Sequence, residues 1–297
     1  MLPSLTRRQT LSIAAALSGS VLAPSLLRAA DTVDPQFAAA LMALEGQLKA
    51  RLGVYVLASA TGQGFGYRAD ERFPLCSTSK ALSVGLVLAG ADSGKLSLEQ
   101  AVEIRPSDLV PYSPVTEKHV GGAMSLVDLC EAAITVSDNT AANLLLSAIG
   151  GPQQVTDFLR STGDRMTRLD RNEPALNQAT PGDPRDTTTP QAIAHTLGSL
   201  ALGNALSDPS RELLAGWLLQ CTTGKEKLRA GFPDTVRIGD KTGAGGHGTS
   251  NDIAVVWPFD GQPFVVSVYL TECAADEATK NAAIARVASL TAKVLNL

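Results

Sequence analysis

The chain has 297 residues, and its 25 basic and 29 acidic side chains give a formal net charge of −4. A mildly acidic chain without basic clusters is not typical of proteins that bind nucleic acid or anionic membranes. A chain of this length can bury a large hydrophobic core, as one large domain or as two intertwined domains.

Residues 1–30 have the pattern of an export signal. Arg7 and Arg8 precede an apolar run from Leu11 to Leu27 that contains no acidic residue. This run is too short and too rich in small residues for a convincing membrane span. A twin-arginine signal and an ordinary secretory signal both fit the pattern. We expect export to the periplasm, cleavage near Ala29 or Ala30, and no membrane contact after cleavage.

The chain after the signal begins and ends with strand patterns. A first helix is predicted after Asp34-Pro35, because an N-cap residue precedes a proline. Strands are then predicted at 53–58 and 64–67, and again at 236–241, 252–257 and 263–271, followed by a last helix at 277–294. The stretch between them, 77–221, is mainly helical by its apolar period.

This order predicts an α+β fold, a sandwich of helices around one antiparallel sheet. The sheet is formed from both chain termini and flanked by helices, with an all-helical domain inserted in the middle. We assign 31–72 and 222–297 to the α/β domain, and 73–221 to the helical domain. An active site is expected in the crevice between the two domains.

The four cysteines invite a disulfide interpretation in an exported protein. Isolated apolar cysteines are usually just buried, so we expect free thiols; these are Cys76, Cys130, Cys221 and Cys273. No cysteine spacing is typical of a metal site. The three histidines, His119, His195 and His247, are scattered as well, so no metal or other cofactor is predicted.

The segment Phe73-Pro-Leu-Cys-Ser-Thr-Ser-Lys80 contains a serine and a lysine three positions apart. If Ser77 opens a helix, Lys80 lies one turn along on the same face. A serine hydroxyl needs a neighbour to accept its proton, and a buried lysine can lose its charge and act as that base. Taken alone, this spacing is common, and a helix start with a surface lysine is the simpler interpretation.

Two tripeptides further along strengthen the catalytic interpretation. Ser137-Asp-Asn139 lies between two apolar helical segments, and Lys241-Thr-Gly243 ends a predicted strand. Either one is weak evidence alone, since Ser-Asp-Asn is also ordinary turn chemistry. Ser-x-x-Lys, Ser-Asp-Asn and Lys-Thr-Gly in this order are the signature of class A β-lactamases and penicillin-binding proteins.

The chain resembles the class A serine β-lactamases over essentially its whole length after the signal. The matching stretches are Cys76-Ser-Thr-Ser-Lys80, Glu173-Pro-Ala-Leu-Asn177, Pro181-Gly-Asp-Pro-Arg-Asp-Thr-Thr-Thr-Pro190 and Asp240-Lys-Thr-Gly243. With Gly248-Thr-Ser-Asn-Asp-Ile-Ala-Val-Val-Trp257 they are most similar to the cefotaxime-hydrolysing, extended-spectrum branch. The resemblance implies hydrolysis of the β-lactam ring of penicillins and cephalosporins through a serine acyl-enzyme. It also implies antibiotic resistance, small-molecule β-lactam substrates and a monomeric enzyme.

The resemblance also implies roles for individual residues. Ser77 is the expected nucleophile, and the backbone N–H groups of Ser77 and Ala244 are the expected oxyanion donors. Ser137 is expected to relay a proton to the departing ring nitrogen, assisted by Lys80 and Lys241. The expected substrate-binding residues are Asn139, Asn177, Lys241, Thr242, Gly243, Ala244, Tyr112 and Ser250.

Glu173 is the expected general base for hydrolysis of the acyl-enzyme, with Asn177 holding the water from the other side. The resemblance implies a cis bond between Glu173 and Pro174. It also implies an ion pair between Arg171 and Asp186 at the neck of the loop 168–186. Whether Lys80, or Glu173 through its water, accepts the Ser77 proton during acylation stays open.

Departures from the family pattern limit the prediction of substrates. Ser250 replaces an arginine that binds the antibiotic carboxylate in many relatives, and Lys227 and Lys280 are candidate substitutes. Gly245 stands where some carbapenem-hydrolysing relatives have a cysteine, so that bridge to Cys76 is unavailable. Two other functions share the three motifs: a D,D-peptidase acting on peptidoglycan, and a penicillin sensor that stays acylated. Neither needs Glu173 and Asn177.

Overall fold

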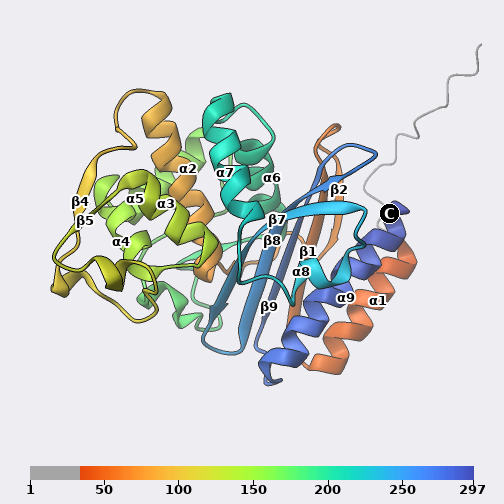
Figure 1. Cartoon of the computed structure of the whole chain (residues 1–297). Helices are drawn as coiled ribbons and strands as arrows, with labels where there is room; N and C mark the ends of the chain where they lie inside the picture. The colour runs from red at the N-terminus through yellow and green to blue at the C-terminus, as the bar shows by residue number, and fades with distance from the viewer. Residues whose placement is uncertain (1–33) are drawn as a thin grey trace, which may run out of the picture. The chain divides into compact units, whose positions relative to one another are not determined.

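The central sheet has five antiparallel strands in the order β2-β1-β9-β8-β7 (Figure 1). The computed structural model describes residues 34–297, so the predicted export signal lies outside the described residues. The strands are β1 (Arg51–Ala58), β2 (Gly64–Tyr67), β7 (Val236–Gly245), β8 (Thr249–Pro258) and β9 (Phe264–Thr271). The prediction of one antiparallel sheet built from both ends of the chain is confirmed.

Helices cover both faces of this sheet. The helices α1 (Pro35–Leu48) and α9 (Glu277–Leu295) lie side by side on one face, and α6 (Pro190–Ala201) packs against β1 and β9 from the other (Figure 1). Val54 and Val56 therefore face one hydrophobic cluster, while Tyr55 and Leu57 face the second. All eight residues of β9 are buried, which explains its nearly continuous apolar sequence.

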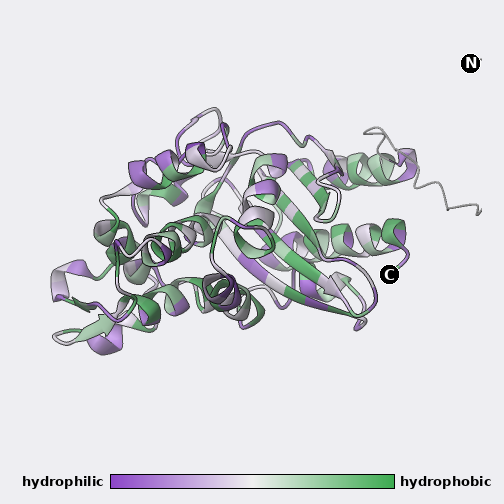
Figure 2. Cartoon of the chain, turned by 90° about the horizontal axis from the view of Figure 1, so that it is seen from above, coloured by the Kyte–Doolittle hydropathy of each residue, from purple (hydrophilic) through white to green (hydrophobic). Residues whose placement is uncertain are grey.

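The middle of the chain is mainly helical, as predicted. Its longer helices are α2 (Ser79–Asp92), α3 (Leu126–Thr135), α4 (Asn139–Ala148), α5 (Pro152–Ser161) and α7 (Asp208–Leu219). The shorter elements are α8 (Leu228–Gly231) and the two-stranded pairs β3 (Phe73–Pro74) with β6 (Thr187–Thr188) and β4 (Ala101–Glu103) with β5 (Ala123–Ser125). Figure 2 shows green, apolar segments along the central strands and both colours on the surrounding helices.

The predicted boundaries at two of the motifs need correction. Helix α2 begins at Ser79 rather than Ser77, which instead lies in the preceding 3₁₀ turn Cys76–Thr78. Strand β7 continues to Gly245, so the Lys-Thr-Gly motif lies within the strand rather than at its end. The reason is pairing with β8, which holds the glycine-rich segment extended as far as the pair Gly245–Thr249. Within residues 34–297, no helix is long and apolar enough to cross a membrane.

Candidate active site

Ser77 lies in a short turn that is fastened to the sheet. The hydroxyl of Thr78 donates to the carbonyl of Leu75 and is 2.9 Å from the Tyr269 hydroxyl on β9. The Asn251 side-chain amide on β8 donates to the Pro74 carbonyl at 2.8 Å. These contacts hold the buried Ser77 hydroxyl in place at the start of α2.

Lys80, in the first turn of α2, is the centre of the polar network. Its Nζ donates to Ser77 Oγ at 2.8 Å, to the Ser137 carbonyl at 2.8 Å and to Asn139 Oδ1 at 2.6 Å. Glu173 Oε1 lies 3.0 Å from the same nitrogen. Burial lowers the pKa of Lys80 to about 8, although the negative charge of Glu173 acts in the opposite direction. The amine can therefore release a proton near neutral pH.

The Ser137 hydroxyl lies between two lysines. Its Oγ is 3.2 Å from Lys80 Nζ and 3.0 Å from Lys241 Nζ, which comes from β7. Lys241 is completely buried, and this burial lowers its pKa. Ser137 has a φ of 62°, in the left-handed region that costs a non-glycine residue about 1–3 kcal/mol. The surrounding contacts thus hold a strained backbone that places this hydroxyl between two amines.

Sequence reasoning did not assign a role to Asp138, which supports that backbone. Its buried carboxylate caps α4 by accepting from Ala141 N at 2.8 Å. It also accepts from Val115 N and from the backbone and hydroxyl of Thr116, all at about 3 Å. Asp138 therefore ties the loop that precedes β5 to the Ser-Asp-Asn motif.

The Oδ1 atom of Asn139 accepts a hydrogen bond from Lys80 Nζ and so helps to orient the amine. Its side-chain amide also donates to the Pro111 carbonyl at 2.8 Å, and its backbone N–H donates to the Tyr112 carbonyl at 3.0 Å. The Tyr112 side chain is 59% exposed, so its ring is free to contact a bound molecule. The predicted contact of Asn139 with a substrate amide stays a prediction.

Glu173 faces the nucleophile. Its Oε1 accepts from Ser77 Oγ at 3.2 Å, and its Oε2 accepts from the Asn177 side-chain amide. Asn177 Oδ1 is buried and has no hydrogen-bond partner among the described residues. The bond between Glu173 and Pro174 is cis, as predicted. The Glu173 carboxylate therefore lies between the Ser77 hydroxyl and the Asn177 side chain in a buried part of the site.

Asn143 is a further residue that sequence reasoning missed. Its side chain accepts from the Glu173 N–H at 2.8 Å and donates to the Glu173 carbonyl at 2.9 Å. Asn143 lies four residues after Asn139 on α4, so both side chains lie on one helix face. That spacing is the signal that could have identified it.

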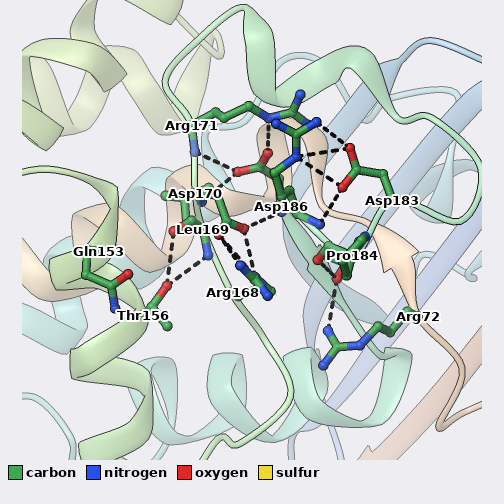
Figure 3. A network of polar contacts seen from close by, with 12 residues as sticks. Arg72, Gln153, Thr156, Arg168, Leu169, Asp170, Arg171, Asp183, Pro184 and Asp186 are labelled. Atoms are coloured by element: carbon green, nitrogen blue, oxygen red, sulfur yellow. Dashed lines mark hydrogen bonds and ion pairs between the residues drawn. The ribbon is translucent and has the colours of Figure 1, made fainter.

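The neck of the loop 168–186 is closed by the predicted ion pair (Figure 3). Arg171 Nε lies 2.5 Å from Asp186 Oδ2, which confirms the predicted pair. Asp186 Oδ1 also accepts from the backbone N–H groups of Asp170 and Arg171, at 2.7 and 2.9 Å. The Asp170 carboxylate in turn accepts from Asp186 N at 2.9 Å. These contacts hold the first residues of the loop against its last residue, Asp186.

Strand β7 passes directly beside the nucleophile turn. A Cβ atom at Gly243 would lie 3.0 Å from the Leu75 carbonyl and 3.3 Å from Cys76 Cβ, so only a small residue fits there. A Cβ atom at Gly245 would lie 2.6 Å from Cys76 Sγ. Ala244, between these two glycines, is exposed. The predicted oxyanion role of its N–H stays a prediction.

Ser250 lies on β8 opposite Ala244 and accepts a hydrogen bond from Lys227 Nζ. Lys227 is only 6% exposed, and its Nζ is 3.6 Å from Glu277 Oε1. Lys280 instead forms an ion pair with Glu277 at 2.9 Å. Of the two lysines considered as substitutes for the missing arginine, the structure brings Lys227 to Ser250.

Most of the predicted site residues therefore form one hydrogen-bonded network. The network links Ser77, Lys80, Ser137, Asn139, Glu173, Asn177 and Lys241. Within the part of the chain that the structure describes, no group of three or more His, Cys, Asp or Glu side chains could hold a metal ion. In this network the nucleophile, the Lys80 amine and the Glu173 carboxylate lie within hydrogen-bonding distance of one another, and the Lys241 amine is joined to them through Ser137.

Comparisons with known proteins agree with this chemistry. The model of the "Beta-lactamase enzyme family" matches residues 36–295. Beta-lactamase Toho-1 of Escherichia coli is 48% identical over 92% of this chain and 92% of its own length. Beta-lactamase OXY-1 of Klebsiella oxytoca is 44% identical over 98% of each chain. CTX-M enzymes are also among the relatives, for example CTX-M-97 of Escherichia coli at 49% identity over 89% of this chain and 90% of its own.

Solved structures give the same result. An ancestral class A β-lactamase is 57% identical, with a TM-score of 0.86, and the match covers 87% of this chain and 100% of that chain. A putative class A β-lactamase, PenP from Rhodopseudomonas palustris, is 52% identical with a TM-score of 0.86, covering 87% and 99% of the two chains. The predicted family and fold are confirmed: the chain belongs to the class A β-lactamases, enzymes that hydrolyse β-lactam antibiotics.

Proposed function

We propose that hydrolysis proceeds in two steps, acylation of Ser77 and deacylation, and that the catalytic residues are Ser77, Lys80, Ser137 and Glu173. In acylation Ser77 Oγ attacks the β-lactam carbonyl and its proton passes to a base. The carbonyl–nitrogen bond then breaks, and Ser137 passes a proton to the ring nitrogen. Support for this relay comes from the two amines at 3.2 and 3.0 Å from Ser137 Oγ, which can resupply its proton.

The oxyanion of the tetrahedral intermediate would be stabilised by the backbone N–H groups of Ser77 and Ala244. One such donor typically contributes about 3 kcal/mol to lowering the barrier. The proposal is supported by the close approach of β7 to the nucleophile turn at Gly243. Asn139 and Tyr112 would contact the substrate side chain. Lys241 and Thr242 on β7 would contact the substrate carboxylate, next to Gly243.

Deacylation is the step that distinguishes hydrolysis from permanent acylation. We propose that Glu173 removes a proton from a water, whose oxygen attacks the ester carbon. The bond between that carbon and Ser77 Oγ then breaks, and the proton held by Glu173 passes to Ser77 Oγ to regenerate the alcohol. The observation that carries this proposal is that Glu173 Oε1 lies 3.2 Å from Ser77 Oγ while its Oε2 accepts from Asn177. A carboxylate so close to the ester oxygen is within reach of a water that attacks it.

The test is the variant Glu173→Ala incubated with benzylpenicillin. We expect the variant to be acylated and to keep the adduct, because the ester forms but its general base is missing. Intact-protein mass spectrometry should show a persistent increase by the whole mass of the antibiotic. Ser77→Ala is the control and should show no adduct. Normal steady turnover by Glu173→Ala would refute the assignment of the base.

We also propose that Lys227 supplies the positive charge for the substrate carboxylate, with Ser250 beside it. This is supported by the burial of Lys227 and its hydrogen bond to Ser250. Lys227→Ala should raise KM roughly tenfold or more for benzylpenicillin, because a charge-assisted contact is lost. Lys280→Ala, which removes a lysine already paired with Glu277, is the matched control. Equal effects of the two substitutions would contradict the proposal.

Three further features are proposals from the sequence pattern. The enzyme acts as a monomer in the periplasm after residues 1–30 are removed, which fractionation of cells and light scattering of the purified enzyme would test. Its folding units are an α/β domain of 31–72 and 222–297 and a helical domain of 73–221. Limited proteolysis near residues 72 and 221 would test these boundaries.

A further inference from the structure

The segment 221–224, which follows α7, lies between the end of α3 and strand β7. Thr222 donates twice to the Thr135 carbonyl, from its backbone N–H at 2.9 Å and from its hydroxyl at 3.0 Å. On the other side, a Cβ atom at Gly224 would lie 1.9 Å from Asp240 Oδ2, so the segment packs directly on β7. It is therefore held against both the helix that precedes Ser137 and the strand that carries Lys241.

Thr223 makes a side-chain contact with the Lys-Thr-Gly motif. Its Oγ1 lies 2.6 Å from Thr242 Oγ1, and Cys221 Sγ lies 3.3 Å from Thr223 Oγ1. Cys221 is buried and Thr223 is half-buried. A thiol and two hydroxyls thus form a chain of three groups that ends at Thr242, next to Lys241.

The direction of the hydrogen bond between the two threonines matters for an anionic substrate. A hydroxyl has one proton to donate. If Thr242 donates to Thr223, its lone pairs are left for the substrate, and a carboxylate is repelled. If Thr223 donates to Thr242, the Thr242 proton is free to bind the carboxylate. The Cys221 thiol also hydrogen-bonds to the Asp240 carboxylate, so the orientation of the Thr242 hydroxyl is assigned to Thr223 alone.

We propose that Thr223 is a positioning residue that turns the Thr242 hydroxyl toward the carboxylate of the substrate. The proposal rests on the proposed contact between Thr242 and that carboxylate. Thr223 thus contributes to binding the carboxylate form of the antibiotic and takes no part in the covalent steps. The segment 221–224 can do this because Gly224 lets it lie directly against Asp240.

The test compares Thr223→Val, which keeps the shape and removes the hydroxyl, with Thr223→Ser, which keeps the hydroxyl. For benzylpenicillin we expect Thr223→Val to raise KM roughly three- to tenfold with kcat changed by less than about twofold, because one neutral hydrogen bond is lost. Thr223→Ser should restore the wild-type KM. For the methyl ester of benzylpenicillin, which lacks the negative charge, Thr223→Val and the wild type should have equal kcat/KM.

Two results would overturn the proposal. One is an equal loss of kcat/KM on the acid and the ester, which indicates general damage to the site. The other is an unchanged KM for the acid in a folded Thr223→Val variant, with folding checked by its thermal unfolding midpoint. If Thr223→Val does not fold, Thr223→Ala, measured beside Thr223→Ser, asks the same question. The proposal then requires a raised KM for benzylpenicillin in Thr223→Ala and an unchanged KM in Thr223→Ser.

These outcomes are separate from the test of the catalytic base. Steady turnover of benzylpenicillin by the wild type together with a trapped Glu173→Ala adduct supports the hydrolytic assignment whatever Thr223 does. A failure confined to the Thr223 variants would leave that assignment intact.

Discussion

At the scale of single residues, the site depends on how charge is balanced around Ser77. Lys80 has almost no access to water, and Glu173 Oε1 is the carboxylate oxygen 3.0 Å from its amine. Burial disfavours the ammonium form of Lys80, whereas the carboxylate favours it. The burial effect is the larger of the two, so the pKa of Lys80 falls to about 8.

This balance predicts how the rate of acylation depends on pH. Below pH 8 the Lys80 amine holds its proton and cannot accept one from Ser77, so acylation through Lys80 rises as pH increases through about 8. Glu173→Gln removes a neighbouring negative charge that stabilises the ammonium. The pKa of Lys80 should then fall further, and the midpoint of the acylation profile should move to lower pH. Quenched-flow mass spectrometry of the Ser77 adduct across pH measures this.

The control for that experiment is Glu103→Gln, because Glu103 is an exposed acid on β4. Its profile should match that of the wild type. If Glu173→Gln instead acylates slowly at every pH without a shift of the midpoint, Glu173 and its water are the acylation base. The experiment therefore decides the question that the sequence left open.

At the scale of elements, the loop 168–186 carries the deacylation residues and must be held in place. Its only helical or strand element is the 3₁₀ turn Ala175–Gln178, so few backbone hydrogen bonds stabilise it internally. Asp186 supplies contacts at its neck, and Asn143 on α4 holds Glu173 from outside the loop. The position of Glu173 thus depends on side chains of its neighbours.

The variant Asp186→Asn tests this dependence. It removes the charge that pairs with Arg171 in a buried place, and we expect a loss of about 1–3 kcal/mol in the free energy of unfolding. Deacylation should slow more than acylation, because Ser77 and Lys80 lie outside the loop. Hydrogen exchange of residues 168–186 and single-turnover kinetics measure the two effects.

Asp183→Asn is the matched control for Asp186→Asn. Asp183 lies on the same loop and pairs with Arg185, but the Arg185 side chain is 50% exposed, so water screens this pair. We expect stability and kinetics close to those of the wild type. If both variants slowed deacylation equally, the neck contact would not be what positions Glu173.

At the scale of the whole molecule, the reactivity of the four cysteine thiols measures how well the core is packed. All four are buried and none forms a disulfide in the described structure. Burial raises the pKa of the Cys130 and Cys221 thiols, so little thiolate is available for reaction. We expect the folded enzyme to react very slowly with Ellman's reagent and the enzyme unfolded without reductant to titrate all four thiols.

A fully reduced sample, unfolded in the same way, is the control for this titration. If the sample unfolded without reductant titrated fewer thiols than the control, a disulfide would have formed. That result would contradict the interpretation of the cysteines as buried thiols. Mass spectrometry of the alkylated enzyme would then identify which two cysteines are joined.

The whole molecule also decides among the three functions that share the motifs. A D,D-peptidase and a penicillin sensor both remained open from the three motifs alone. The family match across residues 36–295 and relatives named β-lactamases at 44–49% identity show the hydrolytic enzyme. The expectation drawn from Glu173 and Asn177 is in agreement with this result.

Sequence alone determined the family, the antiparallel sheet built from both ends of the chain, and the residues of the three motifs. It could do so because these signals are local: the three-residue spacing of Ser77 and Lys80, or an alternation along a strand, acts between near neighbours. Tertiary structure alone decided that Lys227 rather than Lys280 reaches Ser250, that Asn143 holds Glu173, and that Thr223 meets Thr242. Those pairs are separated by 19 to 30 positions, and only the packing of helices and loops against the sheet brings their side chains together.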